Sequence, residues 1–98
     1  MADDAAKVAP HAYKMIFENE RTRVLEVVMK PGESTAMHSH PDYVVYLIGQ
    51  GKVRFTSPTG EGAELELPAG AVMWRDAEEH ATENIGGTEV RALFFEPK

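Results

Sequence analysis

The chain has 98 residues, enough for one domain, and its 16 acidic and 10 basic side chains give it a formal net charge of −6. This charge argues against nucleic-acid binding, which normally requires a basic stripe. There is no cysteine, no apolar run long enough to span a membrane and no segment typical of a signal peptide, so we expect a cytoplasmic protein without disulfides that does not act at a membrane.

Short segments of alternating apolar and polar residues follow one another along most of the chain. Residues 1–10 are rich in alanine and acidic side chains and predict a flexible N-terminal tail. After this tail we expect a single barrel domain over residues 11–98. The pattern predicts short strands over residues 11–18, 24–29, 38–40, 43–48, 52–56, 63–67, 71–74, 80–84 and 89–95. Eight or nine such strands, joined by Pro and Gly turns and without a convincing helix, predict an all-β sandwich or barrel.

Two of the four histidines, His38 and His40, lie one residue apart, just before the most apolar run, residues 43–48. That run lacks polar alternation, which predicts a strand covered on both faces. Side chains at i and i+2 of a strand point to the same face, so the two imidazoles should enter one space. Imidazole is the commonest metal ligand, and a catalytic site typically uses three protein ligands. His80, at the start of a late strand, is the candidate third ligand, and His11 we expect to be solvated.

Spacing alone leaves a second interpretation open for these histidines. A His-x-His pair is as compatible with a solvated strand edge as with a pair of ligands. A single histidine such as His80 is more often an ordinary surface or core residue.

Two spaced motifs resemble those of the cupins. The first cupin motif runs Gly, five residues, His-x-His, three or four residues, Glu, six residues, Gly. Here five residues separate Gly32 from His38-Ser39-His40, and Gly51 follows at a matching distance. The second motif runs Gly, five residues, Pro-x-Gly, then His, three residues, Asn. Its counterparts in this chain are Gly62, Pro68-Ala69-Gly70, His80 and Asn84. The resemblance covers residues 11–96 and extends to small, single-domain RmlC-like cupins labelled β-alanine degradation proteins of the BauB type.

The chain departs from the cupin pattern in two places. The glutamate ligand should fall at position 44 or 45, and both residues are valine; residues 71–79 also widen the usual gap before the second-motif histidine. The resemblance therefore implies a double-stranded β-helix, or jelly roll, with His38, His40 and His80 as metal ligands and no glutamate. Asp42 or Tyr43 could replace it only if that corner folds inward. Three imidazoles suit Zn, Fe, Ni or Cu.

Several other side chains are candidates for lining a ligand cavity or supporting the ligands. Arg54 could clamp a carboxylate, although a solvent-facing arginine is the alternative. Asn84 shares parity with His80 and is expected to bond a turn or the free N–H of a ligand histidine. The glutamates Glu33, Glu78 and Glu79 are interpreted as solvated loop charges. The candidate substrate-binding residues are Tyr43, Tyr46, Arg54, Met73 and Trp74.

These features support three hypotheses about function. The first is a metal-binding cupin that acts on a small anionic metabolite, with an oxygenase, isomerase or hydrolytic reaction as the enzymatic form. The second is a non-catalytic module that binds or senses a small molecule. The third is a metal-free, epimerase-like barrel with a histidine base and Tyr43 or Tyr46 as the acid. The resemblance also implies a homodimer, with residues 90–95 as an interface or core strand.

Overall fold

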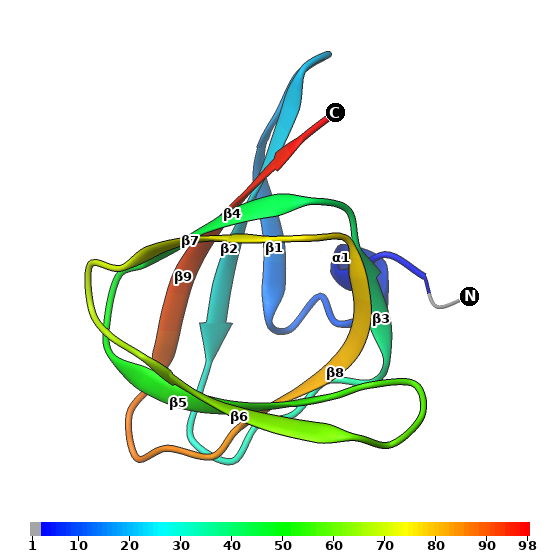
Figure 1. Cartoon of the computed structure of the whole chain (residues 1–98). Coiled ribbons are helices and arrows are strands. Elements are labelled where there is room, and N and C mark those ends of the chain that lie inside the picture. The colour runs from blue at the N-terminus through cyan, green and yellow to red at the C-terminus, as the bar shows by residue number, and fades with distance from the viewer. Residues whose placement is uncertain (1–2) are drawn as a thin grey trace.

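The computed structural model describes residues 3–98, and Figure 1 shows the elements that they form. In chain order these are α1 (Ala5–Val8), β1 (Tyr13–Glu18), β2 (Thr22–Met29), β3 (His38–His40), β4 (Tyr43–Leu47), β5 (Gly51–Thr56), β6 (Gly62–Leu67), β7 (Val72–Arg75), β8 (Glu78–Asn84) and β9 (Val90–Pro97). None of the helices formed by these residues is long and apolar enough to cross a membrane.

The nine strands formed by the described residues make two sheets that enclose one interior (Figure 1). The five-stranded sheet has the order β1-β2-β9-β4-β7, and the four-stranded sheet has the order β3-β8-β5-β6. All neighbouring strands run antiparallel. The predicted all-β, double-stranded β-helix is therefore confirmed.

Period-two alternation explains which side chains enter the interior. On β9 every second side chain is buried, beginning with Val90 and including Phe94. On β4 the buried side chains alternate in the same way, but Tyr46 between them is exposed. The prediction that residues 43–48 are covered on both faces is wrong, because Tyr46 and Ile48 on the outer face are exposed although they are apolar. An unbroken apolar run here marks one buried and one exposed face.

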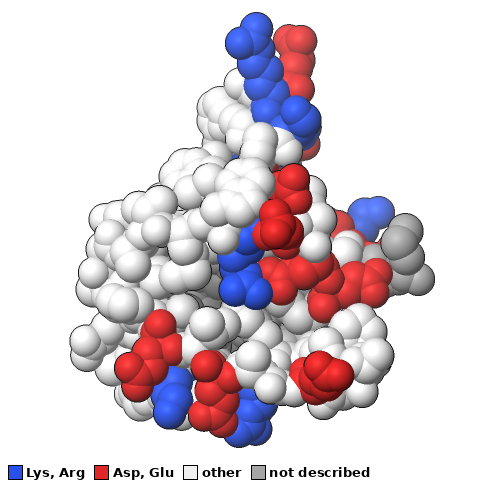
Figure 2. Space-filling view, viewed as in Figure 1, with Lys and Arg blue, Asp and Glu red and all other residues white. Residues whose placement is uncertain are grey.

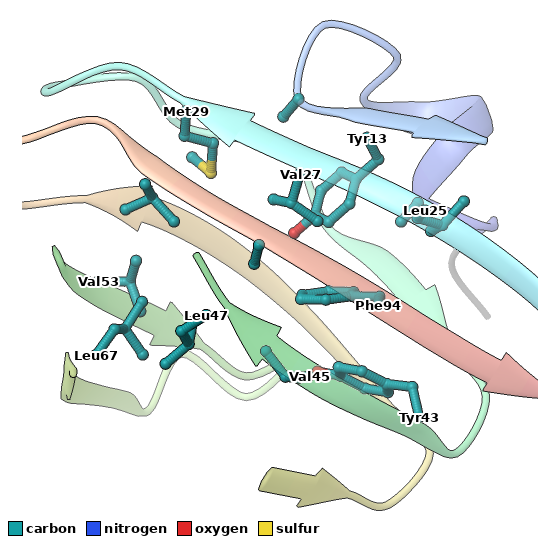
Figure 3. Close-up of a cluster of buried hydrophobic side chains, with 14 of the residues drawn as sticks. Tyr13, Leu25, Val27, Met29, Tyr43, Val45, Leu47, Val53, Leu67 and Phe94 are labelled. Carbon is teal, nitrogen blue, oxygen red and sulfur yellow. The ribbon is translucent and has the colours of Figure 1, made fainter. Parts of the chain in front are cut away.

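The core gathers between the sheets, and Figure 3 shows aromatic rings beside the aliphatic side chains. The rings of Tyr43 and Phe94 lie 4.7 Å apart, centroid to centroid, and that of Tyr13 lies 5.8 Å from Phe94. Fully buried Leu25 and Leu47 each contribute roughly 1.5–3 kcal/mol of apolar burial. These three aromatic rings lie at the end of the core that contacts the histidine rings.

The N-terminal segment, residues 3–9, differs from the predicted flexible tail. Its helix α1 begins after Asp4, whose carboxylate accepts a hydrogen bond from the Ala6 N–H, and the side chains of Ala5 and Ala9 are fully buried. Alanine is small enough to pack closely against the strands, which a composition-based prediction of a tail does not consider. Residues 1 and 2 of the predicted tail lie outside the described residues.

Candidate metal centre

Strands β3 and β8 are antiparallel neighbours, and their register places His38 directly opposite His80. His40 shares the inward face of β3 with His38. The ring centroid of His38 lies 4.8 Å from those of both His40 and His80, and the latter two are 5.0 Å apart. The three residues are 0%, 3% and 2% exposed for His38, His40 and His80. The structure thus brings together the three histidines that the sequence singles out.

Ligand atoms of these three residues all lie within 4.8 Å of one another. The Nε2 atoms of His38, His40 and His80 are buried and make no hydrogen bond within the described part of the chain. A buried polar atom without a partner costs roughly 1–3 kcal/mol. Neutral imidazole nitrogens are ligands for divalent transition metals, so three orphaned nitrogens at one place fit a metal ion.

The other ring nitrogen, Nδ1, faces an oxygen in each case. His38 Nδ1 lies 2.8 Å from the Ala36 carbonyl oxygen, at hydrogen-bond geometry. His80 Nδ1 lies 3.1 Å from Glu78 Oε1, but the angles do not make this contact a hydrogen bond. His40 Nδ1 lies 3.7 Å from Glu96 Oε2, an ion-pair distance rather than a hydrogen bond. A carbonyl or carboxylate oxygen can only accept, which favours the proton on Nδ1 and leaves the Nε2 lone pair available.

Burial keeps two of the imidazoles uncharged at neutral pH. Burial lowers the pKa of His38 to about 4, partly offset by the hydrogen bond to the Ala36 carbonyl. Burial also lowers the pKa of His80, against the opposing influence of the Glu78 carboxylate. The neutral imidazole is the form that binds a metal. Burial therefore disfavours protonation of these two imidazoles and leaves them in the neutral form that can bind a metal ion.

Two carboxylates behind the histidine rings were not among the predicted site residues. Glu78 is half-buried on β8: burial opposes its charge, but hydrogen bonds from Arg75 and its other partners hold the pKa of its carboxyl below the usual range. Its interpretation as a solvated loop charge is wrong, because β8 begins at Glu78 and turns it to the same face as His80. Glu96 is 2% exposed at the end of β9. Glu96 lies two residues after the buried Phe94 on the same strand, so the alternation of β9 could have predicted that its side chain points inward.

Of the predicted cavity-lining residues, Tyr43 and Met73 face the interior. The Tyr43 ring lies 4.9 Å from that of His40, and its hydroxyl donates to Glu78 Oε2 at 2.8 Å. Both residues line the cavity described below.

Three other predicted lining residues lie on the outside. Tyr46 and Trp74 are exposed on the outer face of the five-stranded sheet, because β4 and β7 turn their alternate side chains inward. Arg54 is exposed on β5 and pairs with Glu64 across the β5–β6 hairpin, which matches the alternative of a solvent-facing arginine. The predicted carboxylate clamp is therefore absent from the interior.

Asn84 is buried and bonds backbone rather than a histidine. Its side-chain amide donates to the carbonyl oxygens of Met29 and Thr88, both at 2.9 Å, and its side-chain oxygen accepts from the Gly86 N–H at 3.0 Å. Of the two expected roles, bonding a turn is the one that the structure shows.

An apolar cavity of about 40 Å³ lies inside the barrel, and none of the three histidines is among the described residues that line it. Tyr13, Tyr43 and Phe94 line it, and their rings also contact that of His40. Val45 lines it as well, so an apolar side chain stands at one of the two positions where cupins carry glutamate. A space of this size holds a few water-sized groups. A ligand that fits it without rearrangement is therefore small.

Phe55 and Arg75 separate this cavity from the outer surface. The Phe55 ring stacks on His80 at 4.4 Å and an interplanar angle of 5°, and the Arg75 guanidinium lies 4.8 Å over the same ring. Both residues line the inner cavity and also a surface pocket that reaches His80. Leu65 lines both spaces as well, so these three side chains together separate solvent from the interior on this side.

Comparison with protein-family models and with curated proteins found no match. Among solved structures, the chain is similar to a cupin domain from Bordetella pertussis, with 31% identity and a TM-score of 0.80 over 88% of this chain and 91% of that chain. It is also similar to a protein with a double-stranded β-helix domain from Klebsiella pneumoniae (20% identity, TM-score 0.66, 85% and 72% covered). An RmlC-like cupin from Methanocaldococcus jannaschii (14% identity, TM-score 0.67, 88% and 78% covered) shares the fold. The likeness to the Bordetella domain, over most of both chains, shows that this chain belongs to the cupin superfamily.

Proposed function

We propose that this protein is a small cupin that binds one divalent transition metal ion, Zn, Fe, Ni or Cu, through His38, His40 and His80 and holds a small anionic metabolite there. The observation that carries the proposal is the group of three buried Nε2 atoms without hydrogen-bond partners in the described chain. Nitrogen donors of this kind suit all four metals. Such an ion supplies Lewis acidity towards a bound oxygen or water.

Charge and cavity chemistry together support an anionic ligand. Three neutral imidazoles add no negative charge to a divalent ion, so an anionic donor is favoured as a further ligand. Arg75, the cation among the described residues that line the cavity, already forms hydrogen bonds of 2.6 and 2.9 Å with Glu78. The rest of the cavity is almost entirely apolar. The ligand would therefore combine one anionic group with a short apolar part.

The residues offer little to a metal-free epimerase-like mechanism. Burial raises the pKa of Tyr43 above its usual range, and its proton is already donated to Glu78. Tyr46 lies on the outer face. Neither tyrosine is placed as an acid towards a ligand in the cavity.

Metal analysis of the purified protein tests the proposal. We expect about one metal ion per chain in the wild-type protein and in His11→Ala, because His11 is exposed and outside the cluster. His38→Ala and His80→Ala should lose it. Equal metal content in all four proteins would contradict the proposal. Oxygen uptake and product formation over a panel of small carboxylates then separate an oxygenase or isomerase from a non-catalytic binder.

We also propose that the protein forms a homodimer through the outer face of its five-stranded sheet. The register places one uncharged side chain on each strand side by side in a row: Phe17, Val24, Phe95, Val44 and Trp74. Figure 2 shows a broad uncharged surface to the left below the projecting β1–β2 hairpin, with charged side chains at the hairpin tip, near the centre of the view and along the lower edge. Around a two-fold axis this row meets its own copy without opposing like charges. Strand β9 would then serve both core and interface.

Light scattering tests the dimer. The wild-type protein should have twice the mass of one chain at micromolar concentration, and Trp74→Glu should shift it to the monomer because Trp74 is 54% exposed in the row. A monomeric wild-type protein would exclude the dimer.

A further inference from the structure

Glu96 is a buried carboxylate that the proposed metal site does not itself use. Its Oε1 accepts a hydrogen bond from Arg23 Nε at 2.7 Å. Its Oε2 is buried without a hydrogen-bond partner and lies 3.7 Å from His40 Nδ1. Burying an ionised carboxylate is expensive unless a cation and hydrogen bonds accompany it. The Glu96 carboxylate therefore faces the Nδ1 side of the His40 ring, where it can influence the orientation of that ring.

Arg23 holds Glu96 from one side and is itself held from the other. The two residues face each other in the β2–β9 register. The Arg23 Nη1 and Nη2 atoms donate to the two carboxylate oxygens of Asp4 at 3.0 and 2.5 Å. A planar guanidinium with donors fixed on two sides has little freedom to turn. Its position therefore determines where the Glu96 carboxylate lies.

Asp4 in turn belongs to the segment that covers the histidine-bearing strand. The Ser39 N–H donates to the Asp3 carbonyl oxygen at 2.8 Å, and Asp4 forms a parallel bridge with Ser39. Ser39 lies between the two histidines of β3, which is an edge strand of its sheet. The N-terminal segment thus contacts the site twice, once through the backbone of β3 and once through Arg23.

We propose that Asp4 and Arg23 are positioning residues of the metal centre, which through Glu96 hold the His40 ring with Nε2 directed towards the other two histidines. This inference rests on the proposed metal binding. Glu96 is the carboxylate within ion-pair distance of His40 among the described residues. A carboxylate on the second nitrogen of a ligand histidine fixes its orientation and basicity, and its loss typically lowers metal affinity 10–100-fold.

Competition with a chromogenic chelator measures the zinc affinity of the wild-type protein and its variants. Glu96→Gln and Arg23→Met should each lower the affinity about 10–100-fold, and Asp4→Asn should lower it less, in the same direction. Arg23→Lys keeps the positive charge but not the planar guanidinium with its several donors, so it should lower the zinc affinity less than Arg23→Met does. Arg54→Met is the matched control, because it removes an exposed arginine–carboxylate pair that is not part of the histidine cluster, and it should leave the affinity unchanged.

Nitrogen-15 NMR of the zinc-free proteins supplies a readout that general loss of stability does not move. The wild-type His40 ring should carry its proton on Nδ1, and Arg23→Met and Glu96→Gln should shift the ring towards the other tautomer. Wild-type affinity and an unchanged His40 tautomer in both variants would overturn the positioning role while leaving metal binding intact. A wild-type protein that binds no zinc would overturn both proposals. If Arg23→Met does not fold, Asp4→Asn decides by the same two measurements.

Discussion

Acid should destabilise the metal-free protein in part through one buried ring, that of His38. The residue is fully buried, and burial lowers the pKa of its imidazole from 6.5 to about 4. The unfolded chain therefore binds this proton more tightly than the folded one. Because the folded-state value is the lower of the two, the stability from this group is complete above pH 6.5 and is lost as the pH falls towards 4.

The size of the effect follows from the difference between the two pKa values. At about 1.4 kcal/mol for each pH unit, the full loss is about 3 kcal/mol, of which about 2 kcal/mol falls between pH 7 and pH 5. A domain of this size is typically stable by about 5–15 kcal/mol. Protonation of this one ring therefore removes a large share of the total stability.

Urea unfolding followed by circular dichroism at about pH 7, 6 and 5, with EDTA present, measures the loss. The wild-type free energy of unfolding should fall by about 2 kcal/mol more over this range than that of His38→Gln, which cannot take up the proton. His11→Gln, at an exposed position, should behave like the wild type. If His38→Gln and the wild type showed the same dependence on pH, burial of this ring would not be the cause.

Three further substitutions address the core, a turn and the missing ligand. Leu47→Ala, at a side chain 1% exposed, should cost roughly 2–5 kcal/mol in urea unfolding, and a cost below about 1 kcal/mol would mean that the site collapses without a cavity. Asn84→Ala leaves the buried carbonyl oxygens of Met29 and Thr88 without their donor and should cost about 3 kcal/mol in the same assay. Asn84→Asp should recover none of this loss, because a carboxylate cannot donate to the two carbonyl oxygens. Val45→Glu, at a cupin glutamate position, should raise zinc affinity about tenfold while lowering metal-free stability, and unchanged affinity in chelator competition would show that position 45 does not reach the ion.

The histidine cluster was predictable because its geometry is mostly local. The i, i+2 relation places His38 and His40 on one face of any regular strand. His80 required non-local information, since no spacing rule pairs residues so far apart in the chain. Its place at the start of a late strand made it a candidate, and the resemblance to the second cupin motif supported that choice. The β3–β8 register places His80 opposite His38.

Inside and outside were harder to assign on strands that are apolar on both faces. Tyr46 and Trp74 have the composition of core residues, yet they lie on the outer side of the five-stranded sheet. Only the parity of neighbours such as Val45, which faces the cavity, decides between the faces. A hydrophobic pattern does not distinguish an exposed apolar face from a buried one, because the same residue types occur in a core and at an interface.

The supporting carboxylates could not be recognised from composition. Glutamate is usually solvated, and Glu96 is buried only because Arg23 on a neighbouring strand accompanies it. Asp4 lies in a stretch whose alanines and acids are typical of a loose tail. The stabilising partner is distant in sequence, and no local rule connects the two.

The valine at position 45 changes how charge is balanced at the proposed centre. The donor cluster in the described residues consists of three histidines alone. The nearest carboxylates, Glu78 and Glu96, face the Nδ1 atoms of His80 and His40, so each lies one ring further from the ligand nitrogens than a direct ligand would. They support the imidazoles without neutralising the ion directly. Under the proposed function, the remaining negative charge would come from the bound molecule. The charge of that molecule and its fit to the apolar cavity would then be two independent criteria by which the protein selects its ligand.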